Sequence, residues 1–68
     1  MEDLKEIITE LKKRRRFLKI SQEDLAQIAE ISLRSLKKLE SGKGNPRFKS
    51  LSKIVDALGM TVQIRIKS

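Results

Sequence analysis

Among the polar side chains, the types and spacing of three best fit the binding of a partner: Arg34, Lys37 and Lys38. They recur at intervals of three and four residues, so on a helix they lie on one face. Arginine and lysine carry several hydrogen-bond donors and no acceptor. Such a face suits an anionic or acceptor-rich partner.

Enzymatic chemistry is further disfavoured by the residue types that the sequence lacks. Most nucleophilic and acid-base schemes use cysteine, histidine or tyrosine, and the chain contains none of them. A Ser/Lys or Asp/Glu site is conceivable, but no residues are spaced like one. We therefore expect no enzyme, no metal site and no cofactor. The absence of cysteine is also compatible with a reducing, cytoplasmic location.

The charge balance indicates the class of partner. Sixteen Lys and Arg against nine Asp and Glu give a formal net charge of +7 in 68 residues, which predicts attraction to nucleic acid or to an anionic membrane surface. The longest apolar runs are dipeptides, too short for a spanning helix or a signal peptide. A cationic membrane-binding peptide is therefore the remote alternative, because such a peptide needs neither several capped helices nor a terminal strand.

Apolar residues with a 3.6-residue period predict a mainly α fold in a single small domain. Ser21 and Ser32 are favourable N-caps, and Gly42 and Gly59 suit helix ends. The expected helices cover residues 3–18, 22–29, 33–41 and 48–58. Basic residues at the end of the first helix, over 12–16, suit the helix dipole and form a solvated face, although they also add to long-range attraction.

After Gly59 the period changes to two, and the alternation predicts one β-strand in residues 60–68. We expect residues 1–59 to form the globular domain and this strand to serve dimerisation. A solitary strand leaves backbone groups unpaired, so its partner is expected to be the same strand of a second copy. Fraying and pairing with a different protein are the alternatives. The strand residues on one face are Met60, Val62, Ile64 and Ile66.

The second and third helices are separated by a turn of three to four residues around Glu30 and Ile31. Two short helices so joined, the second basic on its outer face, are the sequence form of a helix-turn-helix. The small Ala26 allows the helices to cross closely. The second helix of the pair is then free to enter a DNA major groove.

Several motifs resemble, in order and spacing, the Cro/CI (Xre-type) family of helix-turn-helix DNA-binding domains. They are SQEDLA at 21–26, ISLRSL at 31–36, LESGK at 39–43, NP at 45–46 and ALG at 57–59. The resemblance covers roughly residues 11–59 and implies a DNA-binding transcriptional repressor. The two-fold axis of the expected strand pairing would present both copies of the third helix to a palindromic operator. The tail after Leu58 further resembles HipB-type antitoxins, which implies a HipA-like kinase toxin as partner. A stand-alone repressor is the alternative.

The resemblance assigns base-facing positions to the third helix. Arg34 is the foremost of them, since a guanidinium binds guanine O6 and N7 bidentately, for about 1–3 kcal/mol of discrimination. Leu33 would either contact a thymine methyl or pack in the interior. The base-facing positions are Ser32, Leu33, Arg34, Lys37 and Lys38.

Other positions acquire supporting roles by the same resemblance. Gln22 would contact a phosphate and brace the base-reading side chains. Lys43, Asn45 and Arg47 would meet the DNA backbone from the loop after the third helix. Arg15 and Glu40 match a largely buried salt bridge between the first and third helices.

The chain departs from the family pattern at three positions. Glu30 and Lys19 stand where glycine is common, and a left-handed conformation costs a non-glycine residue roughly 1 kcal/mol. Arg47 stands where a helix-capping serine is frequent. These departures concern the geometry of the turns and not the expected order of helices.

Overall fold

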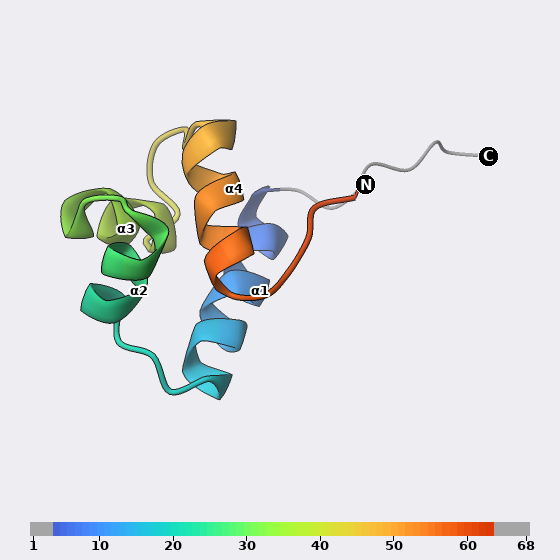
Figure 1. Cartoon of the computed structure of the whole chain (residues 1–68). Helices are drawn as coiled ribbons and strands as arrows, with labels where there is room; N and C mark the ends of the chain where they lie inside the picture. Colours follow the sequence, from blue (N-terminus) through green and yellow to red (C-terminus); the bar gives the residue numbers. More distant parts are fainter. Residues whose placement is uncertain (1–3, 64–68) are drawn as a thin grey trace.

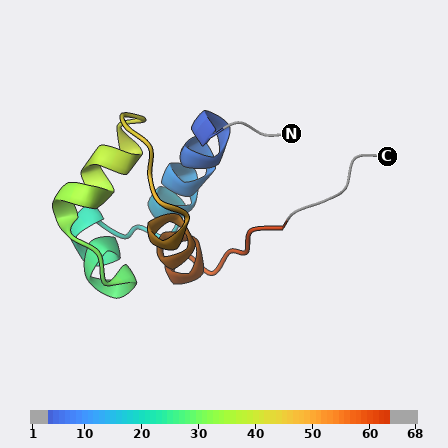
Figure 2. The same cartoon turned by 90° about the horizontal axis from the view of Figure 1, so that it is seen from above.

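The computed structural model describes residues 4–63, and this part of the chain contains four helices. α2 and α3 lie together on one side of the molecule, with α1 on the other and α4 beside both groups (Figure 1; Figure 2). No helix within the described residues is long and apolar enough to cross a membrane. The helices are α1 (Leu4–Phe17), α2 (Gln22–Ala29), α3 (Leu33–Glu40) and α4 (Phe48–Ala57).

Serine caps determine where α2 and α3 begin. The Ser21 hydroxyl accepts a hydrogen bond from the Asp24 N–H, and the Ser32 hydroxyl accepts one from the Ser35 N–H, both at 3.0 Å. Each bond satisfies an amide that the first helical turn leaves without a backbone partner. The helix bounds predicted for residues 22–29 are confirmed. The mainly α fold is confirmed as well, and the described residues contain four helices, as expected.

The turns before and after α2 contain the two non-glycine residues with positive φ in the described chain. Lys19 has φ 56° and Glu30 has φ 58°. At Glu30 the backbone N–H donates back to the carbonyls of Ala26 and Gln27, which closes the end of α2. The turn therefore keeps the geometry that glycine usually provides, at the cost of a strained side-chain-bearing residue.

Replacing Glu30 with glycine should therefore stabilise the protein by about 1 kcal/mol, because the left-handed conformation carries no Cβ penalty in glycine. Urea unfolding of the wild type and the Glu30→Gly variant measures the difference. Ser41→Gly is the matched control, since Ser41 caps α3 with φ −77°. A gain in stability for Ser41→Gly as large as that for Glu30→Gly would refute the explanation.

One continuous apolar core joins all the helices. Leu36 is fully buried, and Leu25, Ile54 and Leu58 are each 1% exposed. The small Ala26, 4% exposed, lies in the same core, as expected for a close crossing of α2 on its neighbours. The remaining buried apolar side chains are Ile8, Leu11, Ala29, Leu39, Leu51 and Val55.

The apolar pattern fails at helix ends. Phe48 lies in the apolar period expected over 48–58 but is 66% exposed, and Leu18 lies in the one expected over 3–18 but is 38% exposed. Phe48 is the first residue of α4, and Leu18 follows the last residue of α1. At these ends the apolar period continues although no neighbouring helix covers the side chain, so periodicity alone overstates burial there.

The segment after α4 is anchored at its start and then leaves the helical body. Arg14 Nε donates to the Leu58 carbonyl at 3.1 Å, and Met60 is half-buried against the core. Residues 61–63 extend away from the helices (Figure 1) and are neither helix nor strand. Val62 is 44% exposed, and Ile64 and Ile66 lie outside the described residues. The strand and its pairing between two copies stay a prediction.

Candidate nucleic-acid interface

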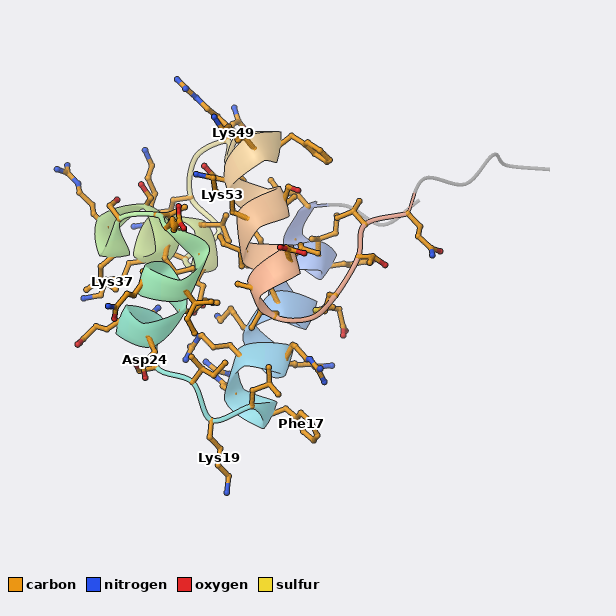
Figure 3. The ribbon with its side chains drawn as sticks, viewed as in Figure 1. Phe17, Lys19, Asp24, Lys37, Lys49 and Lys53 are labelled. Atoms are coloured by element: carbon orange, nitrogen blue, oxygen red, sulfur yellow. The ribbon has the colours of Figure 1, made fainter. Side chains whose placement is uncertain are left out.

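α3 presents one face to the core and the opposite face to solvent. Leu36 and Leu39 are buried, while Arg34, Lys37 and Lys38 are exposed. Figure 3 shows Lys37 at the left edge of the molecule, where α2 and α3 lie, while Phe17 lies at the bottom, at the end of α1. The cationic face anticipated from the spacing is therefore available to a partner.

A buried ion pair joins the end of α3 to α1. Arg15 Nε donates to Glu40 Oε2 at 2.8 Å, and Nη2 donates to Oε1 at 3.0 Å. Arg15 Nη1 also donates to the Ile20 carbonyl at 2.9 Å. The side chains are only 13% and 6% exposed. The paired geometry and the extra hydrogen bond compensate the desolvation of both charges, so this contact fixes the orientation of α3 on α1.

Gln22 extends this network to the start of α2. Its Nε2 donates to Glu40 Oε1 at 3.1 Å, and the residue is half-buried. An amide nitrogen carries two hydrogens, so this bond holds the carboxamide in place without using its full donor capacity. This bond holds the Gln22 side chain beside the end of α3.

Ser32, which precedes α3, and Leu33, its first residue, both contribute to the stability of the fold. Besides capping the helix, the Ser32 hydroxyl donates to Ser35 Oγ at 2.8 Å. Leu33 is half-buried and packs against the core. Of the five positions expected to face bases, these two are therefore partly committed to the fold.

One open hollow lies between α3, the following loop and the start of α4. It has a volume of about 380 Å³. Its cations are Lys38, Lys43 and Arg47, and no acidic side chain lines it. We call it the loop hollow, and its lining residues are Ile31, Ser35, Lys38, Leu39, Lys43, Asn45, Pro46, Arg47 and Ser50.

A second open hollow, of about 360 Å³, lies on the other side of α3, against α1 and the start of α2. The carboxylate of Glu40 is paired with Arg15, so the charge that remains there is positive. We call it the α1 hollow, and its lining residues are Lys12, Arg15, Arg16, Gln22, Lys37, Glu40 and Ser41.

The structure thus groups the expected phosphate contacts into two places. Lys43, Asn45 and Arg47 line the loop hollow, whereas Gln22 lies in the α1 hollow. Sequence reasoning treated residues 12–16 mainly as a solvated face, and it missed that Lys12 and Arg16 line the same hollow as Gln22. Their position could have indicated this, because the last turns of α1 are separated from Gln22 by only one short loop.

Comparison with known proteins agrees with this geometry. A family model described as helix-turn-helix matches residues 11–64, which includes all of α2, α3 and α4. Searches of curated proteins and of solved structures find no match to the chain. The chain belongs to the Xre/Cro-CI-type helix-turn-helix family of DNA-binding transcriptional regulators.

Proposed function

We propose that the protein is a sequence-specific repressor that binds a palindromic operator in duplex DNA through α3. The observation that carries the proposal is the position of Arg34 on an exposed helix face between two cationic hollows. A B-DNA major groove is about 12 Å wide and admits one α-helix. Phosphates border the groove on both sides, so cations on both flanks of a helix lying in it are placed to bind them.

The proposed roles follow from this placement. Arg34 lies deepest in the groove, where its guanidinium binds a guanine edge. The exposed part of Leu33 would meet a thymine methyl, with Ser32 beside it. Lys43 and Arg47 bind phosphates from the loop hollow. The remaining phosphate contacts are proposed for Gln22 and Asn45.

Selection of bound duplexes from a random pool tests sequence-specific binding. We expect enrichment of a consensus with two-fold symmetry, whose half-sites are about 34 Å apart. Affinity for the enriched duplex should also fall steeply with salt, with a log–log slope of roughly −5 to −7 if a dimer neutralises about 6–8 phosphates. Absence of any enriched sequence would contradict the proposal.

The symmetric operator requires a homodimer, and we propose that the tail provides its interface. The tail starts from a defined point, since the Arg14–Leu58 hydrogen bond holds the end of α4 on α1. No strand exists elsewhere in residues 4–63 to pair with an alternating segment. Antiparallel pairing of two tails would satisfy their backbone groups and cover Val62 together with Ile64 and Ile66.

Removing residues 61–68 should therefore convert a dimer into a monomer that binds the operator more weakly. The helical core should survive, because the truncation keeps every buried residue of α1 to α4 and Leu58. Sedimentation equilibrium of the full chain and the truncated chain measures the mass. An unchanged mass would remove the tail from the interface.

We further propose that this repressor is an antitoxin, because its tail resembles that of HipB-type antitoxins. In this form the protein would bind a HipA-like kinase toxin in addition to its operator. Co-expression with the product of a neighbouring kinase-like gene, followed by purification through a tag on this chain, tests the idea. A stable complex supports it, whereas a dimer that binds operator without any such partner favours the stand-alone repressor.

A further inference from the structure

We infer that Lys37 and Lys38 bind phosphates on opposite sides of the groove and do not read bases, which leaves Arg34 as the discriminating side chain of α3. The inference rests on the proposed binding of duplex DNA. It narrows the expectation that all three cations face base edges.

The angular positions on α3 separate the three side chains. Successive residues of an α-helix are rotated by about 100°, so Lys38 lies about 40° to one side of Arg34 and Lys37 about 60° to the other. Lys38 lines the loop hollow, Lys37 lines the α1 hollow, and Arg34 lines neither. Lys37 and Lys38 therefore point to opposite sides of Arg34 around the helix axis.

The end of the Lys38 side chain lies close to Gly44 in the loop. A Cβ built on Gly44 would lie 2.9 Å from Lys38 Cε and 3.6 Å from Lys38 Nζ. The end of the lysine side chain thus occupies the space that any larger residue at position 44 would take. Its ammonium group is directed to the same hollow as Lys43 and Arg47, where it adds to a cluster suited to a phosphate.

Lys37 also lies among cations, in the hollow on the other side of α3. The α1 hollow contains Lys12 and Arg16 from α1 and the fixed carboxamide of Gln22. Because Glu40 is neutralised by Arg15, an anion that enters this hollow meets a positive field. Lys37 completes the cationic border on the side of α3 away from the loop.

The chemistry of the side chains fits this division. A guanidinium is a rigid fork that matches guanine O6 and N7, whereas an ammonium acts as a flexible point charge. Phosphate contacts contribute affinity for every sequence and fix the register, while base contacts distinguish sequences. Arg34 should therefore carry most of the sequence preference, and the two lysines should carry little of it.

The test compares alanine variants on two labelled duplexes of equal length, the enriched operator and a scrambled duplex of the same composition. We expect Lys37→Ala and Lys38→Ala each to weaken binding to both duplexes by the same factor, and to reduce the salt slope by about one for each phosphate that is no longer neutralised. Arg34→Ala should lower the affinity for the operator by about 5- to 150-fold and barely change that for the scrambled duplex beyond its charge effect. Lys5→Ala, on the first turn of α1, controls for net charge alone.

A pair of glycine variants tests the role of the loop contact. Gly42 and Gly44 have nearly equal φ values, +78° and +77°, but nothing lies within 4 Å of a Cβ at Gly42. Alanine therefore strains the backbone alike at both positions and displaces Lys38 only at position 44. Gly44→Ala should weaken binding to both duplexes more than Gly42→Ala does, after both are shown by circular dichroism to be folded.

The outcomes are distinguishable. Loss of operator binding alone in Lys37→Ala or Lys38→Ala, with unchanged binding to the scrambled duplex, would overturn the inference while leaving duplex recognition intact. Equal effects of the two glycine variants would overturn the placement of Lys38 in the loop hollow. Failure of the wild type to bind any duplex would instead refute the proposed function.

Discussion

Replacing Arg15 with methionine should destabilise the protein by about 3–5 kcal/mol, because it leaves the Glu40 carboxylate buried without its counter-ion. Glu40 is 7% exposed, and two of its charge-assisted hydrogen bonds come from Arg15. A domain of 68 residues has about 3–10 kcal/mol of total stability. The loss is therefore a large fraction of the total stability, and thermal and urea unfolding measure it.

The doubly substituted variant Arg15→Met/Glu40→Leu separates the cost of an orphaned charge from the loss of a favourable interaction. With both charges removed, apolar side chains of similar size fill the space, and much of the stability should return. Glu10→Ala is the matched control, because the Glu10–Lys13 pair is 57% and 70% exposed and should contribute little. A single variant as stable as the wild type would show that the ion pair does not hold α3 on α1.

Leu36→Ala should cost about 2–5 kcal/mol through the cavity that it leaves in the core. Leu36 is fully buried and lies on the side of α3 opposite Arg34. The cavity would loosen α3 against α2 and α1, so weaker operator binding should accompany the lower unfolding midpoint. Chemical denaturation and duplex titration of the same samples measure both effects.

Ile28→Ala removes an apolar side chain of similar size from the outer face of α2. Ile28 is 58% exposed, so its truncation should change stability by no more than about 0.5 kcal/mol. If the two variants lost equal stability, burial would not explain the contribution of Leu36.

The helices and the helix-turn-helix pair could be predicted from the sequence alone. Ser21 and Ser32 are short polar caps placed directly before apolar periods, so each marks a helix start by local chemistry. Local signals of this kind need no knowledge of the tertiary structure. Gly59, with φ 72°, follows the end of α4 for the same local reason.

The grouping of the cations could not be read from the sequence. Lys12 and Lys37 are far apart along the chain, and they line one hollow because α3 packs on α1, where the Arg15–Glu40 pair joins the two helices. Periodicity identifies a polar face, but it does not tell which other helix borders that face. The exposure of Phe48 has the same origin, since burial depends on a neighbour that the local pattern does not contain.

The pairing of the tail is a property of two chains. Alternation at Met60 and Val62 favours a strand, but a strand forms its hydrogen bonds only with a partner. Residues 60–63 accordingly have no strand structure in the single chain. The prediction therefore depends on the oligomeric state, which the truncation experiment measures.

The central claim, that the outer face of α3 between the two hollows contacts DNA, is tested most directly by nuclear magnetic resonance. Amide chemical shifts of the labelled protein would be followed while a short duplex of the enriched sequence is added. The account predicts that the largest shifts fall in residues 32–38, at Gln22 and in the loop 43–47. Shifts confined to the outer face of α2 or to the first turns of α1, with α3 unaffected, would contradict it.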